Sequence, residues 1–196
     1  MSTTRPFVRF DAEGMRLCAL GWICAAVLPF APVRSGATEN VLNFAASSHI
    51  VNTTGCVTTV DFTFEAWVRM TAAQAENQIV CQYKAGDAGR MIVALQNDRP
   101  GLFIGSWLTG SAVNFTNTWT HLAVTRSGSA CKIYVNGVQN ASGTINANTL
   151  APTGITIGGL SFLNTGFRGQ IADVRVWSVA RTQAEISAAM GSRLTG

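Results

Sequence analysis

Short extended segments separated by turn residues follow one another from residue 41 to residue 178. The clearest is Phe62–Met70, in which every second residue is apolar, so one face of an extended chain can be buried. Glycine, asparagine, aspartate and proline separate these segments, as they do in turns. Many short strands with frequent turns predict an all-β chain folded as an antiparallel sandwich or barrel. The other predicted strands lie within 41–51, 79–83, 91–95, 102–104, 121–126, 131–135, 155–157 and 170–178.

Two local signals organise the C-terminal half of the chain. Asn136-Gly137 joins two extended runs, and both residue types tolerate the positive φ that a two-residue hairpin requires. Close to the end, Thr182 and Glu185 have the spacing of a capping box, in which each side chain bonds the other residue's backbone. A short C-terminal helix is therefore predicted, and Gly191 can end it.

The N-terminus reads as an export signal. Residues 17–28 are all apolar or small, Arg16 stands directly before them, and Pro29 interrupts the run. Ser35-Gly36-Ala37 then provides a small-residue cleavage pattern. A membrane-spanning helix needs about 20 apolar residues, so we expect residues 1–37 to be a cleaved signal. An uncleaved anchor and a buried core helix are the alternatives.

The remaining residues, 38–196, are expected to form one domain that is secreted or located at the cell surface or in the periplasm. The true start of the signal could be Met15, because residues 1–14 contain acidic residues that are unusual at the start of a signal. Removing residues 1–37 removes four of the 14 basic and two of the 10 acidic residues. The remaining basic residues are scattered, so nucleic acid is not an expected partner, and no stable membrane span is expected in the mature chain.

Three cysteines remain after this cleavage: Cys56, Cys81 and Cys131. Their spacing does not resemble a zinc site, and an oxidising compartment favours one disulfide plus one free thiol. Cys81 and Cys131 fall within predicted strands, whereas Cys56 falls in a turn. We favour a Cys81–Cys131 disulfide over either pairing with Cys56, although the sequence leaves all three pairings open.

The order of the segments resembles the laminin-G-like jelly-roll domain, a two-sheet sandwich of the concanavalin A-like lectin/glucanase superfamily that pentraxins distantly share. The resemblance spans about Val41 to Gly191 and implies an antiparallel jelly roll followed by a short helix. Each motif is weak alone, but several in the right order indicate the fold, which does not by itself determine function. The segments that carry the resemblance are 62–70, 79–83, 117–137, 155–159 and 166–186.

Calcium is not an expected cofactor. Pentraxins bind it through acidic residues after the strand that matches 155–159, and residues 158–162 here contain no carboxylate. Other members of the superfamily hold calcium at a rim loop, for which Asp87 and Asp98 are the available carboxylates. Calcium takes six to eight oxygens, and neither aspartate has an acidic neighbour in sequence. We therefore expect both to form turns and expect no cofactor, with calcium at a rim loop as the alternative that the sequence leaves open.

Enzymatic activity is not expected either. Glycoside hydrolases of this fold use paired carboxylates, and no predicted strand here has an acid-x-acid pair. The resemblance places the strands of Glu65 and Arg175 close together, which implies a shielded ion pair between them. His121 lies mid-strand, where a hydrogen-bonded packing role is more common than a catalytic one.

A ligand-binding surface is predicted from one tryptophan. The resemblance gives Trp67, Trp119 and Trp177 core positions, whereas Trp107 opens a polar loop. An aromatic ring at a loop mouth offers an apolar face to a sugar, and Asn114 could orient a hydroxyl. The alternative is that Trp107 closes the end of the sandwich without touching a ligand.

Three Asn-x-Ser/Thr triplets, at Asn52, Asn114 and Asn140, are acceptors for N-glycosylation only in a host that modifies exported proteins.

These observations predict a secreted, non-catalytic recognition module that binds an extracellular carbohydrate, glycosaminoglycan or protein through rim loops. A self-associating structural or adhesive surface component is the main alternative, followed by a degenerate glycoside hydrolase.

Overall fold

Fourteen strands and one helix form in the part of the chain that the computed structural model describes. That part comprises residues 8–10, 26–30, 39–46, 48–53, 60–72, 75–82, 90–146, 154–159 and 165–192. The strands pair into two sheets in which every pairing between strands is antiparallel.

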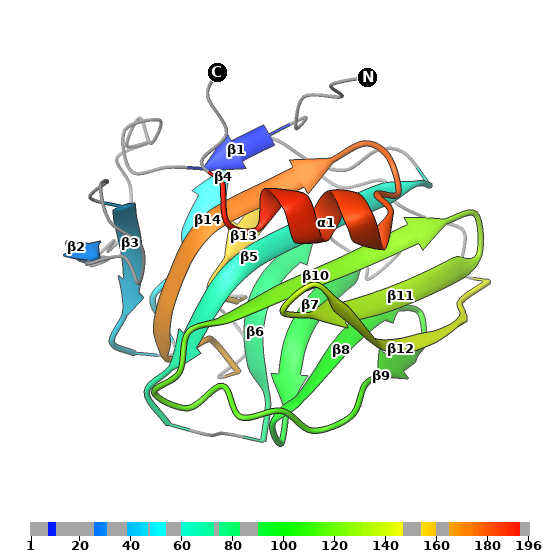
Figure 1. The fold of residues 1–196 in the computed structure, drawn as a ribbon. Coiled ribbons are helices and arrows are strands. Elements are labelled where there is room, and N and C mark those ends of the chain that lie inside the picture. Colours follow the sequence, from blue (N-terminus) through cyan, green and yellow to red (C-terminus); the bar gives the residue numbers. More distant parts are fainter. Residues whose placement is uncertain are drawn as a thin grey trace.

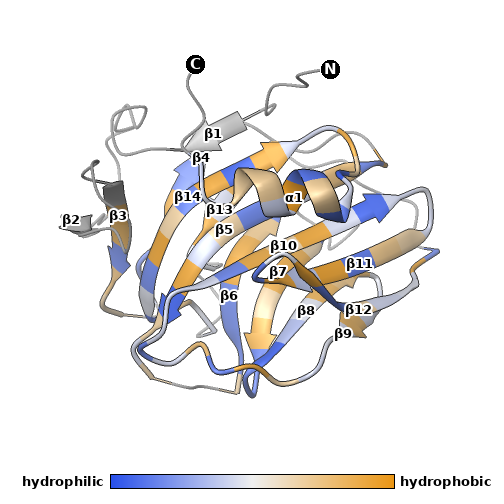
Figure 2. Ribbon diagram, viewed as in Figure 1, coloured by the Kyte–Doolittle hydropathy of each residue, from blue (hydrophilic) through white to orange (hydrophobic). Residues whose placement is uncertain are grey.

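The larger sheet has the strand order β12-β11-β10-β5-β14-β3-β2, and β1 lies alongside β14. Its centre is the pair of nine-residue strands β5 and β14, whose residues alternate between hydrophobic and hydrophilic in Figure 2. The strands of this sheet are β1 (Val8–Phe10), β2 (Ala26–Phe30), β3 (Glu39–Phe44), β5 (Phe62–Met70), β10 (Thr120–Ser127), β11 (Ala130–Val135), β12 (Val138–Thr144) and β14 (Gly169–Trp177).

The smaller sheet has the order β4-β13-β6-β7-β8-β9. Its strands are β4 (Val51–Thr53), β6 (Asn77–Gln82), β7 (Met91–Gln96), β8 (Arg99–Ile104), β9 (Trp107–Thr109) and β13 (Ile155–Ile157). The sequence predicted a loop at Trp107–Thr109, and this interpretation was wrong because the three residues pair with β8 as an edge strand. The turn that reverses the chain contains Gly105, whose φ of 74° favours glycine.

The core lies between the two sheets. Apolar side chains from both, among them Phe64 of β5, Leu102 of β8 and Val124 of β10, form one buried cluster. The predicted all-β antiparallel sandwich is confirmed, and so is the Asn136-Gly137 hairpin, whose φ angles are 49° and 77°.

The short helix α1 (Gln183–Ala189) crosses the outer face of the larger sheet, over β5, β10 and β14 (Figure 1). The predicted capping box is present: Thr182 accepts a hydrogen bond from the backbone of Glu185, whose carboxylate accepts one from the backbone of Thr182. Ile186 is fully buried against Ala123 and Tyr134 of the sheet. The helix is therefore fixed both by its cap and by an apolar anchor.

Side chains of the larger sheet bind the C-terminal end of α1. Trp67 Nε1 donates to the carbonyl of Met190, while Arg175 donates to the carbonyls of Ala189 and Ser192. The last turn of the helix contains no basic residue, so these sheet residues satisfy carbonyls that would otherwise lack intrahelical partners.

The two sheets meet along one side, where β9 lies close to β12. Asn140 on β12 accepts a hydrogen bond from the backbone N–H of Ser111 at 2.8 Å and donates one to the carbonyl of Ser111 at 3.4 Å. Leu108 packs against the core from the same side. We call the Asn140–Ser111 pair the edge clasp, because it connects the two sheets where no strand pairing does.

β1 and β2 lie within residues 1–37, the expected signal, so the boundary at residue 37 stays a prediction. The only helix among the described residues has seven residues, which is too short to cross a bilayer.

Candidate functional site

The outer face of the smaller sheet presents two aromatic side chains next to each other. Along β8, Leu102 and Ile104 point into the core, so Gly101 and Phe103 face outward. Trp107 of β9 stands directly opposite Phe103, and their ring centroids are 5.3 Å apart with the planes at 56°. The Trp107 side chain is 37% exposed, which is unusual for so large an apolar group. We call Trp107 and Phe103 the aromatic platform.

Two further residues of this face shape the platform. The indole of Trp107 rests on Gly101: a Cβ on Gly101 would lie 3.0 Å from Cζ3 and 3.1 Å from Cε3 of the indole. On the Phe103 ring, the guanidinium carbon of Arg90 lies 5.0 Å from the centroid, which is a cation–π distance. Phe103 also packs on the buried cluster of Cys81, Ile92 and Ala94, so the platform has a rigid base.

Trp107 therefore lies on an edge strand at the outer face of a sheet, and not at a loop mouth as the sequence suggested. Asn114 is not beside it. The chain runs antiparallel to β8 from Trp107, opposite Phe103, to Val113, whose N–H donates to the carbonyl of Asp98. The five residue steps along the partner chain from Phe103 back to Asp98 correspond to about 17 Å in an extended strand. Val113 therefore lies about that far from Trp107. Asn114 is exposed at the far end, where its side-chain oxygen accepts the N–H of Thr116.

Sequence reasoning missed Gly101, Phe103 and Arg90. The alternation in Arg99–Ile104 could have placed Gly101 and Phe103 on the outer face, and a three-residue turn centred on Gly105 would have set Trp107 opposite Phe103. Arg90 carries no such signal, because it precedes β7 and reaches Phe103 only through the tertiary fold.

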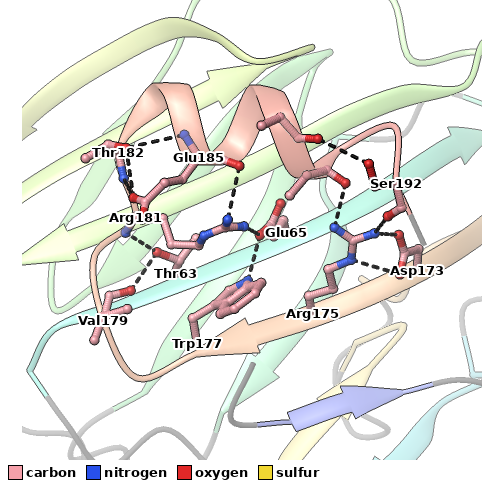
Figure 3. Close-up of polar contacts among 12 residues, drawn as sticks. Thr63, Glu65, Asp173, Arg175, Trp177, Val179, Arg181, Thr182, Glu185 and Ser192 are labelled. Carbon is pink, nitrogen blue, oxygen red and sulfur yellow. Dashed lines mark hydrogen bonds and ion pairs between the residues drawn. The ribbon is translucent and has the colours of Figure 1, made fainter. Parts of the chain in front are cut away.

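Apart from the aromatic platform, a polar cluster centred on Glu65 lies beneath α1 (Figure 3). Its carboxylate is fully buried and accepts hydrogen bonds from Trp177 Nε1 at 2.6 Å and Arg181 Nη1 at 2.7 Å. His121 Nε2 lies 3.5 Å from the other carboxylate oxygen. Arg181 also stacks over the Trp177 ring at 4.1 Å.

The expected ion pair between Glu65 and Arg175 is wrong. The two residues stand opposite each other on β5 and β14, but the pairing shifts between Ala172 and Arg175, where Asp173 has a φ of 50°. A bulge of this kind redirects the following side chain. Arg175 accordingly pairs with Asp173 and reaches the end of α1, and Arg181 takes its place at Glu65.

Burial raises the pKa of Glu65, but His121 and Arg181 outweigh this effect and hold the pKa below its ordinary value. A general acid needs the opposite shift and access to a substrate. In the described structure the pKa of Glu65 is lowered and its carboxylate is buried. Its hydrogen bond with Arg181 instead fixes the segment that leads into α1. His121 is buried against Trp67, with ring centroids 5.4 Å apart.

The predicted Cys81–Cys131 disulfide is not formed, because both residues are free thiols. Cys81 of β6 belongs to the cluster on the outer face of the smaller sheet, whereas Cys131 of β11 points into the core between the sheets. A disulfide requires Cα atoms within about 7 Å and converging side chains. Burial raises the pKa of both thiols, and Cys56 lies outside the described residues.

Of the two aspartates considered for calcium, Asp98 is described and Asp87 is not. Asp98 occupies the turn between β7 and β8 with a φ of 62°, which fits the expected turn-forming role. Within the described ranges, no three His, Cys, Asp or Glu side chains are grouped closely enough to hold a metal ion.

Comparison with known proteins places the fold in a family. A model of the concanavalin A-like lectin/glucanases superfamily matches residues 44–187. Mouse pappalysin-1 is 30% identical over 158 residues, which cover 67% of this chain and 10% of that protein. The chain thus spans about a tenth of the length of the curated relatives it matches.

Two solved structures share the architecture. Domain 4 of AbnA, an extracellular arabinanase from Geobacillus stearothermophilus solved with arabinotriose, superposes with a TM-score of 0.65 at 20% identity, covering 86% of this chain and 81% of that one. The CBM40 domain of a Ruminococcus gnavus sialidase, bound to α2,3-sialyllactose, gives 0.57 at 14% identity, covering 66% and 82%. At these identities the likeness is one of fold. Because the family model spans most of the described sandwich from β5 to α1, the chain belongs to the concanavalin A-like lectin/glucanase superfamily.

Proposed function

We propose that this protein is an exported, non-catalytic module that binds carbohydrate, and that the aromatic platform on the smaller sheet is its binding surface. The observation that carries the proposal is the position of Trp107. This residue is 37% exposed on the outer face of a sheet, although an apolar residue of this size is normally buried. The C–H face of a sugar ring can stack on such a surface while its hydroxyls stay hydrated.

The surroundings of Trp107 favour a small polar ligand over a large apolar partner. Phe103 extends the aromatic surface by one ring, and the Arg90 guanidinium on Phe103 adds hydrogen-bond donors at its border. Of the described residues, only Val60, Trp107, Val138 and Val179 are exposed large hydrophobics. Of these four residues, Trp107 alone lies in a strand of the smaller sheet, so the exposed apolar surface among the described residues of this face is small.

The comparisons support the same class of ligand. The family is named for lectins and glucanases, and two neighbours of the same fold were solved with arabinotriose and with α2,3-sialyllactose. A binding role without catalysis agrees with the burial of Glu65 beneath α1.

The test is a glycan array followed by titration calorimetry, with arabinotriose and α2,3-sialyllactose as the first neutral and acidic probes. Trp107→Ala should weaken binding of the best ligand about 5- to 150-fold, the equivalent of about 1–3 kcal/mol for loss of one stacked ring. Its melting temperature should change little, since the side chain lies on the outer face and not in the core between the sheets.

Val179→Ala is the matched control, because Val179 has the same 37% exposure and lies by the larger sheet, where its carbonyl accepts a hydrogen bond from Thr63 of β5. Asn114→Ala measures whether the distant asparagine takes part. Unchanged binding in Trp107→Ala would refute the platform as the site. Assembly of the protein without glycan would instead support a structural component, and turnover of a chromogenic glycan that Glu65→Gln abolishes would support a hydrolase.

A further inference from the structure

We infer that Gly101 determines the specificity of the proposed carbohydrate site, because its missing side chain leaves room for the Trp107 indole to lie directly on the sheet. The inference rests on the proposed function and concerns the same surface. It makes Gly101 a positioning residue, since the glycine acts through the indole and offers no side chain to a ligand.

The backbone at position 101 does not require glycine. Gly101 lies inside β8, paired with Ala94 on one side and Thr109 on the other, and its φ is outside the positive region where glycine is favoured. A glycine within a strand costs stability relative to a residue with a side chain. The residue type at this position must therefore be explained by what lies above it.

What lies above it is the indole. A Cβ at position 101 would come within 3.0–3.1 Å of the Cζ3–Cε3 edge of Trp107, which is closer than the usual contact distance between carbon atoms of about 3.5–4.0 Å. Trp107 stands opposite Phe103, so the indole reaches Gly101 along the diagonal between neighbouring strands. If residue 101 had a Cβ, the ring could not lie this close to the sheet.

The contact has a consequence for ligand choice. With one edge against Gly101 and the Phe103 ring beside it, the indole is packed on two sides, which restricts its tilt toward the sheet. A pre-oriented ring favours ligands that present a flat C–H face, because less rotational freedom is lost on binding. The expected ligand class is an oligosaccharide whose sugar ring has one face free of protruding hydroxyls.

The alternative is that Trp107 only shields the backbone at Gly101, as aromatic residues do for glycines near sheet edges. In that case Trp107 would contribute to stability and not to binding. Experiment can distinguish shielding from positioning. Only if Gly101 positions the indole should a substitution at residue 101 change the affinity for a sugar.

The experiment compares Gly101→Ala and Gly101→Val with Gly143→Ala. A Cβ on Gly143 would meet Leu108 Cδ1 at 2.9 Å, so this control disturbs the neighbour of Trp107 on β9 without touching the indole. The readouts are the NMR signals of the Trp107 indole N–H and the Phe103 ring without ligand, the melting temperature, and the affinity for arabinotriose and α2,3-sialyllactose.

We expect Gly101→Val to shift both sets of NMR signals and to weaken binding of the better sugar at least tenfold, with a smaller effect for Gly101→Ala and none for Gly143→Ala. If Gly101→Val does not fold, the alanine variant carries the test. Shifted signals with unchanged affinity would overturn the inference. If the wild-type protein binds no glycan while the signals still shift, the proposed function fails, and Gly101 retains only its contact with Trp107.

Discussion

Glu65 illustrates what can and cannot be inferred about a single residue from sequence. A carboxylate among apolar strand residues has to be paired when it is buried, so an arginine partner could be expected. Which arginine it is depends on the bulge at Asp173, a backbone conformation with no clear sequence signal. Arg181 reaches Glu65 from the segment after β14, while Arg175, the residue opposite Glu65, turns toward the end of α1.

A double-mutant cycle tests this assignment. Glu65→Gln combined with Arg181→Met should show a coupling energy of about 1–3 kcal/mol in urea unfolding, because the two groups interact directly in a shielded site. The same cycle with Arg175→Met should give a coupling close to zero. Strong coupling to Arg175 and none to Arg181 would contradict the structure.

The lowered pKa of Glu65 also sets a pH dependence. Since the carboxyl binds its proton less readily in the folded state than in the unfolded state, its stabilising effect is complete above the ordinary glutamate pKa of 4.5. The effect is lost as the pH falls from there through the lowered value. Thermal unfolding between pH 3 and 7 should show wild-type stability approaching that of Glu65→Gln only below about pH 4.5. A constant gap between the two proteins over this whole range would contradict the shift.

At the scale of elements, the sequence was most informative where local chemistry determines the structure. The alternating run Phe62–Met70 is a strand with the predicted bounds, and the capping box begins α1 where expected. Strand β9 escaped prediction because its three residues depend on pairing with β8 and not on their own pattern. The same holds for the aromatic platform, since facing side chains on neighbouring strands follow from register, which a single segment does not contain.

The contact between the β11–β12 hairpin and α1 gives a prediction at this scale. Gly137 has a φ of 77°, and a Cβ there would lie 2.6 Å from Ser187 Oγ on the helix. Gly128 has a φ of 58° and no atom within 4 Å of its Cβ position. Gly128→Ala should therefore cost about 1–2 kcal/mol from the backbone alone, and Gly137→Ala measurably more, in urea unfolding. Equal costs would mean that the hairpin does not support the helix.

On the scale of the whole molecule, the two outer faces differ in availability. The helix α1 covers the centre of the larger sheet over β5, β10 and β14 (Figure 1), and its contacts with Trp67 and Arg175 hold it there. The aromatic platform lies on the opposite side of the sandwich, on the smaller sheet. Sequence reasoning placed the ligand at rim loops because the resemblance suggested the fold without showing which face the C-terminal segment occupies.

The placement of the cysteines in different layers can be tested on the intact protein. Because Cys81 and Cys131 are buried thiols with raised pKa values, they should resist alkylation in the native state and react fully after denaturation. Peptide mass spectrometry, with and without denaturant, distinguishes the sites from the remaining cysteines. A disulfide-linked peptide that contains both residues would contradict the structure.

The edge clasp sets a competition during biosynthesis. Asn140 begins the triplet Asn140-Ala141-Ser142, and the amide nitrogen that would carry an N-glycan is the one that donates to Ser111 in the folded domain. An N-glycan would replace one of the two amide hydrogens, so it would compete with the 3.4 Å bond to the Ser111 carbonyl and leave the Oδ1 bond to the Ser111 N–H available. In a host that glycosylates nascent chains, rapid folding favours a bare Asn140, and slow folding favours a second, glycosylated product in which the edge clasp is weakened.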